Sequence, residues 1–164
     1  ICSNLESAQF EYGRLGAIGM FDVIEHIPDD SSAIDKVYNL LHKNGFFYCT
    51  VPMHPWLWSQ HDVTAGHFRR YTRSGLVRLL QERFKILYFS YFFSALVLPM
   101  FVLKVLPYRL LGNGILLKPE DEHLKDSDLA GRFLRNMLDR EVVRIANKRS
   151  NIMGTSGLIV AQKV

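Results

Sequence analysis

The feature that most constrains the fold is a strand, a helix and a second strand within residues 15–51. Residues 15–21 and 46–51 are short apolar runs, and between them Pro28 and the acids after it open a segment with apolar side chains at helical spacing. Gly45 is expected to end that helix in the left-handed conformation. Both runs are apolar throughout, which is typical of parallel strands covered on both faces. The sequence therefore predicts an α/β fold.

Two further strands and a helix follow in the second half of the chain. Residues 84–89 and 157–164 have the composition of strands, and residues 128–147 have the periodicity of an amphipathic helix. We expect a single domain over residues 1–164, with residues 93–150 forming a helical insertion between the last two strands.

Composition excludes several classes of protein. The 164 residues are 48% hydrophobic and 22% charged, which excludes a disordered chain or a coiled-coil array. A net charge of +4 is mild, and we expect no nucleic-acid partner. Two cysteines make no disulfide framework, and no secretory leader is visible, so the expected location is the cytoplasm, with the inner membrane surface as an alternative.

Three stretches carry a resemblance to class I S-adenosylmethionine-dependent methyltransferases. Residues 19–30 (GMFDVIEHIPDD) resemble a signature that closes the fourth strand of that family's sheet. Residues 40–47 (LLHKNGFF) are similar to the turn into its fifth strand, and residues 157–163 to its last strand. The resemblance implies a partial Rossmann-like doubly wound sheet made of the fourth to seventh family strands, in the spatial order 4-5-7-6, with an apolar helical insertion.

Two parts of the family pattern have no counterpart in this sequence. These are the glycine-rich loop that holds the cofactor and the acidic residue that holds its ribose. The first family strand, which pairs with the fourth, is also missing. Residues 15–21 are therefore expected to form an exposed sheet edge unless residues 1–14 fold over it. We expect the isolated chain to bind S-adenosylmethionine very weakly and to self-associate, as a fragment of a methyltransferase would.

The resemblance places the cofactor S-adenosylmethionine at the end of the first strand. It implies that Met20, Phe21 and Asp22 line the methionine or sulfonium end of the cofactor, with His26 beside them. Asp22, Glu25 and His26 have the spacing of one helical face. We expect Glu25 and His26 to fix the loop through hydrogen bonds; a base role for His26 and a divalent metal are the alternatives, and no metal is predicted.

Residues 52–72 read as a long loop rich in aromatic and basic side chains, followed by Thr72 as a helix cap. The absence of a nearby cysteine argues against zinc, and the residue types favour a substrate pocket. The expected acceptor-binding residues are His54, Trp56, Trp58 and Arg70. The expected catalytic residues are His61, His67 and Tyr71.

Residues 86–103 carry no charge over eighteen positions, which reaches the length of a membrane-span candidate. We interpret them as a strand followed by an apolar helix that covers the pocket, packs in the core or contacts a membrane surface. The predicted function is transfer of a methyl group to a small, hydrophobic or lipid-like acceptor. The alternatives are a methyltransferase-like remnant that serves as a binding or assembly module, and a membrane-associated protein anchored through residues 86–111.

Overall fold

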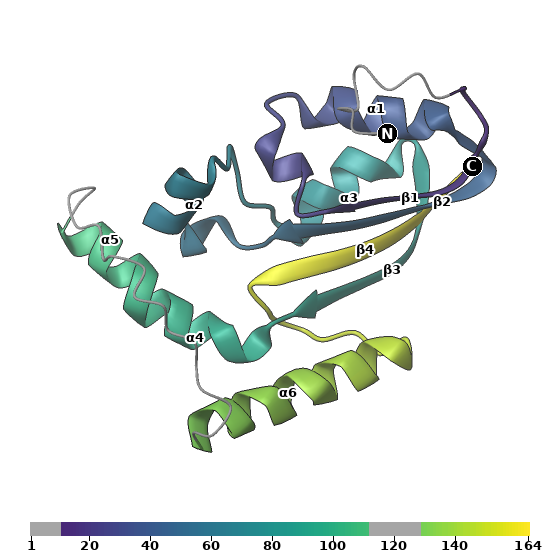
Figure 1. The fold of residues 1–164 in the computed structure, drawn as a ribbon. Coiled ribbons are helices and arrows are strands. Elements are labelled where there is room, and N and C mark those ends of the chain that lie inside the picture. Colours follow the sequence, from purple (N-terminus) through teal and green to yellow (C-terminus); the bar gives the residue numbers. More distant parts are fainter. Residues whose placement is uncertain (1–10, 112–128) are drawn as a thin grey trace.

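The computed structural model of the chain describes residues 11–111 and 129–164, and its centre is a single four-stranded sheet (Figure 1). The strands are β1 (Leu15–Phe21), β2 (Leu41–Pro52), β3 (Phe84–Phe92) and β4 (Ser156–Lys163). Their spatial order is β1-β2-β4-β3; β1 and β2 are parallel, and β4 is antiparallel to both of its neighbours. This order is the 4-5-7-6 arrangement that the family resemblance implies, so the predicted α/β sheet is confirmed.

Strand β1 lies at an edge of the sheet, as the sequence predicts. Among the described residues only β2 pairs with it. Residues 1–14 were expected either to cover this edge or to leave it open, and of these residues 1–10 lie outside the described part of the chain.

The connection from the first helix to β2 differs from the prediction in its backbone. Helix α1 (Asp30–Leu40) begins at Asp29, whose carboxylate accepts from the Ser32 amide at 3.0 Å. The helix ends at Leu40, and β2 starts at once. The left-handed residue is Asn44, with φ +66°, and not Gly45. A Cβ at Gly45 would lie 2.9 Å from the His42 carbonyl oxygen, so glycine is needed there for close approach rather than for φ.

The segment after β2 contains more regular structure than a loop. A 3₁₀ helix (Pro55–Leu57) and helix α2 (Gln60–Ala65) interrupt it. Helix α3 (Arg73–Gln81) follows, and the predicted cap is confirmed, because the Thr72 hydroxyl accepts from the Gly75 amide at 3.0 Å.

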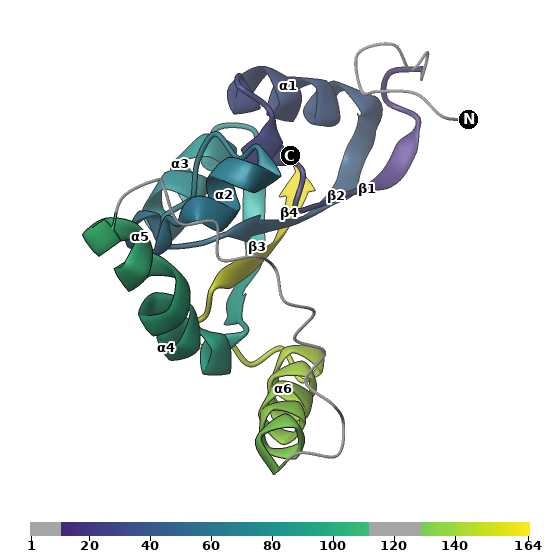
Figure 2. The same ribbon diagram turned by 60° about the vertical axis from the view of Figure 1, so that its left-hand side comes forward.

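The core lies on one face of the sheet, beneath α1 and α3 (Figures 1 and 2). The fully buried side chains at its centre come from both helices and from the strands: Ile34, Val37, Leu76, Leu80, Phe47, Val51 and Ile159. On the opposite face Phe46 and Tyr48 remain 36% exposed. Among the described helices, α1 and α3 cover the first face, whereas on the second face α6 meets only the ends of the strands, where Leu138 and Ile145 line a cavity with Thr50 and Leu158.

The helical segment between β3 and β4 lies mainly beyond the sheet. Helix α4 (Val97–Met100), a π turn (Phe101–Val105) and helix α5 (Leu106–Leu111) run on from β3, which confirms the reading of a strand followed by an apolar helix. Within the described residues, no helix combines the length and apolar character that crossing a membrane requires. The domain limits themselves, including the insertion over 93–150, stay a prediction.

Helix α6 (Leu129–Ala146) forms where it was predicted, but its apolar stripe is not a core face. Val142 on that stripe is largely exposed, and Glu141 is buried among the side chains described for this helix. The Glu141 carboxylate accepts from the amides of Phe93 at 2.7 Å and Ser94 at 2.9 Å. A buried carboxylate thus ties α6 to the corner that follows β3.

Candidate active site

The carboxyl end of β1 carries the residues expected at the cofactor. Asp22 has φ +53°, a conformation that non-glycine residues adopt rarely and often at functional sites. Its amide donates to the carbonyl and to the hydroxyl of Thr50, both at 3.1 Å, which holds this turn against β2. Phe21 is exposed, whereas the Met20 side chain belongs to the core. Phe21 and Asp22 are therefore available at the sheet edge where α/β proteins bind ligands.

A buried carboxylate lies directly after this turn. Glu25, in a 3₁₀ helix (Ile24–His26), is fully buried, and neither of its carboxylate oxygens has a hydrogen-bond partner in the described structure. Burial raises the pKa of Glu25 from its usual 4.5 to about 7, and the negative charge of Asp22 adds to the rise. The expectation that the Glu25 side chain fixes the loop by hydrogen bonds is not met. Instead, its backbone carbonyl accepts from the Phe68 amide at 2.8 Å.

A second buried carboxylate, Asp62, organises the segment after β2. It caps α2 by accepting from the Ser59 amide at 2.9 Å, and it accepts from Arg70 Nε at 2.7 Å and from His67 Nδ1 at 2.9 Å. Burial alone would raise the pKa of Asp62, but the hydrogen bonds from Arg70 and His67 outweigh it and lower the pKa. Asp62 is therefore a carboxylate at neutral pH.

His67 is oriented by this carboxylate. Because Nδ1 is held by Asp62, Nε2 is the ring nitrogen free to act on a ligand. The His67 ring meets the His26 ring edge-on, with centroids 4.7 Å apart. The structure therefore brings the predicted residues His26 and His67 together with Glu25.

Glu25, His26 and His67 also have the chemistry of a metal site. One ligand atom from each lies within 4.8 Å of the other two. Two imidazoles and a carboxylate suit a divalent transition metal, and the Asp62–His67 hydrogen bond is a usual outer-shell contact of such a ligand. The sequence prediction of no metal remains untested.

His61, predicted as a base beside His67, takes no part in this cluster. It lies at an exposed position of α2. Its pKa is lowered by the loss of part of the ring's hydration and by the positive charge of Lys104. It therefore serves as a natural control for His67.

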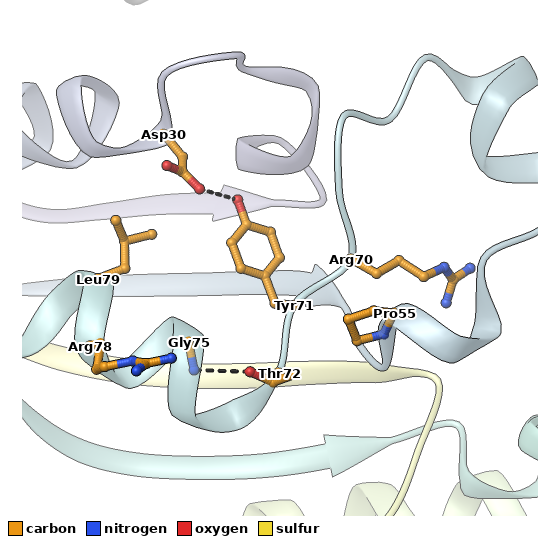
Figure 3. A pocket seen from close by; sticks show the side chains of 8 residues that line it. All are labelled: Asp30, Pro55, Arg70, Tyr71, Thr72, Gly75, Arg78 and Leu79. Atoms are coloured by element: carbon orange, nitrogen blue, oxygen red, sulfur yellow. Dashed lines mark hydrogen bonds between the residues drawn. The ribbon is translucent and has the colours of Figure 1, made fainter.

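Tyr71, the third predicted catalytic residue, is committed to a structural contact. Its buried hydroxyl donates to Asp30 at 2.8 Å, and Arg69 pairs with the same carboxylate at 2.7 Å. Burial and this hydrogen bond raise the pKa of Tyr71, so the phenol stays protonated. Figure 3 shows the Tyr71–Asp30 contact beside an open cavity of about 480 Å³ next to α3. Arg70 also lines this cavity, and its side chain points away from the Tyr71–Asp30 contact.

The predicted acceptor-binding residues lie apart from the Glu25 cluster or are already engaged. His54 stacks on Tyr91, with centroids 5.3 Å apart, and also contacts the ring of Trp56. Trp58 is half-buried. The guanidinium of Arg70 is buried and donates to Asp62 and, at 3.2 Å, to the Met53 carbonyl, so its role is to hold the segment.

A second cavity, of about 390 Å³, opens at the carboxyl ends of β1 and β2, between the strands and α6. Its lining is mostly apolar: Phe21, Thr50, Phe92, Phe93, Leu138, Val142, Ile145 and Leu158, with Glu141 at its side. Of the predicted site residues, Phe21 contributes to it.

Sequence reasoning missed the role of Asp62 and the burial of Glu25. Glu25 was expected to fix the loop, with a metal ligand or the partner of a His26 base as the alternatives, and Asp62 was given no role of its own. The spacing Ser59-x-x-Asp62 is a capping signal that would have marked α2 and drawn attention to Asp62.

Comparison with solved structures places the fold. Geranyl diphosphate methyltransferase in complex with SAM is 14% identical, with a TM-score of 0.55 over 99% of this chain and 56% of that chain. Phosphoethanolamine N-methyltransferase 2 of Haemonchus contortus, also in complex with S-adenosyl-L-methionine, is 17% identical, with a TM-score of 0.51 over 98% of this chain and 36% of that one. The cyclase SpnF is 15% identical, with a TM-score of 0.51 over 99% and 54%.

These likenesses show the class I methyltransferase fold. The chain spans about half of the length of SpnF and of the geranyl diphosphate enzyme, and about a third of the Haemonchus enzyme. No family model and no curated protein matches the sequence.

Proposed function

We propose that the intact protein, as produced from its natural gene, transfers a methyl group from S-adenosylmethionine to a small hydrophobic acceptor. The observation that carries this proposal is the likeness over nearly the whole chain to methyltransferases solved with this cofactor. SpnF, a cyclase by name, has the same fold, so the fold alone does not fix the reaction.

The residues at the end of β1 fit one side of the cofactor. Phe21 and Asp22 are exposed at the carboxyl end of a parallel strand, and the constrained backbone of Asp22 presents its carboxylate there. The described part of the chain offers no glycine-rich loop between a strand and a helix to form the opposite side. When bound, the cofactor supplies an electrophilic methyl group, and the protein has to align the acceptor with it.

The Glu25 cluster supplies the proton acceptor that a hydroxyl or amine nucleophile needs. His67 Nε2 is free, and the hydrogen bond between Nδ1 and the Asp62 carboxylate orients the ring. Glu25, with a pKa of about 7, accepts a proton in the physiological range. We assign His67 as the group that accepts the proton from the nucleophile. Glu25 is the neighbouring carboxylate to which this proton can pass.

The hydrophobic character of the acceptor is supported by the second cavity. Phe21, the predicted cofactor contact, lines the same apolar cavity as α6. The apolar part of an acceptor in this cavity would lie at the strand ends where the cofactor is expected, and a lipid-like or isoprenoid-like chain has the matching chemistry. Glu25, His26 and His67 do not line the cavity, so the reacting group has to extend beyond it to reach His67.

A non-catalytic binding module is the second candidate. The observation that favours it is the missing glycine loop within the described residues. This candidate predicts that the intact protein retains the fold and binds no S-adenosylmethionine.

The test is a titration of the intact protein with S-adenosylmethionine, followed by radiolabelled methyl transfer to a panel of hydrophobic acceptors. Asp22→Ala should weaken cofactor affinity more than acceptor affinity. His67→Ala should reduce turnover about 10²–10⁴-fold while cofactor binding is kept, because general bases contribute in that range.

His61→Ala is the matched control, since it removes an imidazole six residues away that lies outside the cluster. If His61→Ala and His67→Ala lose turnover equally, the assignment of the base is wrong. Loss of activity in a chelator, with recovery on adding a divalent ion, would assign Glu25, His26 and His67 to a metal instead.

A further inference from the structure

We propose that the outer face of the helical rod Val97–Leu111 docks on the surface of an anionic lipid bilayer. The rod comprises α4, the π turn and α5, and Figure 1 shows it running away from the end of β3 as one continuous helical segment. The proposal does not rest on methyl transfer, because it concerns a surface and not the Glu25 cluster.

The inner face of the rod is fixed to the protein. Val105 is fully buried and Val97 nearly so. The Phe101 ring packs edge-on against Trp56, with centroids 5.7 Å apart. Arg109 donates to the Trp56 carbonyl at 2.8 Å. The orientation of the rod is therefore set by packing, and its other face is held toward solvent.

The outer face is apolar along its whole length. Its side chains have exposed fractions from 39% to 73% and are Leu98, Val102, Leu103, Leu106 and Leu110. Leu98, Val102, Leu106 and Leu110 recur every four residues, and Leu103 adjoins Val102 in the π turn. Five exposed large aliphatic side chains within thirteen residues form the kind of patch that marks an interaction site.

Charge identifies the occupant. Between residues 86 and 111 the sequence contains Lys104 and Arg109 and no acidic residue. Lys104 is exposed, whereas Arg109 donates to the Trp56 carbonyl on the inner side of the rod. An apolar helical face with basic and no acidic side chains on the same helix is the pattern of helices that lie in the interface of anionic membranes. A second copy of the chain is disfavoured, because a symmetric contact would bring the basic groups of both rods together. The absence of a spanning helix among the described residues agrees with a surface position.

The experiment is flotation of the full 164-residue chain with two kinds of vesicle: pure phosphatidylcholine, and phosphatidylcholine with about one third phosphatidylglycerol. We expect binding to the anionic vesicles that weakens on raising the salt, since the attraction between surface charges is screened. The double variant Leu98→Gln/Leu110→Gln should lower the partition coefficient at least tenfold. Both side chains point to solvent, so the variant should keep its thermal midpoint.

Two matched controls isolate the rod. Val143→Gln/Ile152→Gln changes two aliphatic side chains outside the rod and outside both cavities that are 59% and 95% exposed, and it should leave partitioning unchanged. Lys104→Glu should weaken binding to anionic vesicles, whereas Lys43→Glu, an identical charge change at an exposed position on β2, should have a much smaller effect.

Two results overturn the proposal: failure of the chain to float with both kinds of vesicle, and an equal loss of partitioning in the Val143→Gln/Ile152→Gln control. If the chain does not float and Leu98→Gln/Leu110→Gln abolishes its self-association in sedimentation, the face is a contact between copies instead.

Discussion

The two faces of the sheet use the same kinds of residue with opposite results. Along β2, Phe47 and Val51 are fully buried beneath α1 and α3, while Phe46 and Tyr48 remain 36% exposed on the other side. The amino-acid pattern barely distinguishes them, because aromatic side chains alternate to both faces. An apolar strand therefore indicates that both of its faces favour burial, but it does not show that another element packs on each face.

The sharpest test of the comparison uses two adjacent phenylalanines. Phe47→Ala should lower the free energy of unfolding by about 3–5 kcal/mol, because it leaves a cavity in a packed core. Phe46→Ala should cost about 1 kcal/mol or less, since that ring is already partly in water. Urea denaturation of the 164-residue chain measures both. Equal losses would mean that the open face is covered in solution.

The second test uses Glu25, the carboxyl group buried just after β1. Because the pKa of Glu25 is raised, the folded protein holds a proton that the unfolded chain releases between pH 4.5 and about 7. The stabilisation is present below this window and is lost as the pH rises through it. The rise in the Glu25 pKa from 4.5 to about 7 corresponds to about 3 kcal/mol in the free energy of unfolding.

Glu25→Gln mimics the protonated carboxyl group and should remove this loss. Unfolding measured at pH 5 and pH 8 should then show the variant gaining up to about 3 kcal/mol on the natural protein at the higher pH. An identical pH dependence of the two proteins would show that Glu25 ionises normally. Comparison with the variant isolates this residue from Asp62, whose lowered pKa acts in the opposite direction at lower pH.

The smallest expected change in stability concerns the open face and its edge. Ala17 is exposed on β1 and pairs across the sheet with Phe46. Ala17→Lys should weaken self-association at least tenfold, because a lysine on an edge strand opposes pairing with another chain. It should change the free energy of unfolding by less than about 1 kcal/mol. Sedimentation velocity is the measurement.

Thr64→Lys provides the control, with the same added charge at an exposed position of α2. A protein that stays monomeric at all concentrations would contradict the expected self-association. Equal effects of Ala17→Lys and Thr64→Lys would mean that the added net charge, and not the sheet edge, controls self-association.

Much of the fold could be predicted because its signals are local. The caps at Asp29 and Thr72 sit beside clear periodic runs, and the strand order follows from the family resemblance. The choice of Asn44 over Gly45 for the left-handed position could not be predicted, because both residue types tolerate it.

The site was harder to predict than the fold. The partners of Asp62 are His67 and Arg70, five and eight residues further along a segment with no periodic pattern. These contacts are strong only because the fold buries them, which the sequence does not reveal. Glu25 is notable for the partners it lacks, which no sequence pattern records. The open face escaped prediction for a related reason, since a strand's own sequence does not say what packs on it.

The single carboxylate of Asp62 has a thermodynamic consequence. It holds His67 on one side and Arg70 on the other, and Arg70 also contacts Met100 of the docking rod. A group shared in this way couples two sites. If docking of the rod on a bilayer shifts Arg70, the affinity of His67 for a ligand changes by some factor. Linkage then requires the ligand to change the affinity for the bilayer by that same factor.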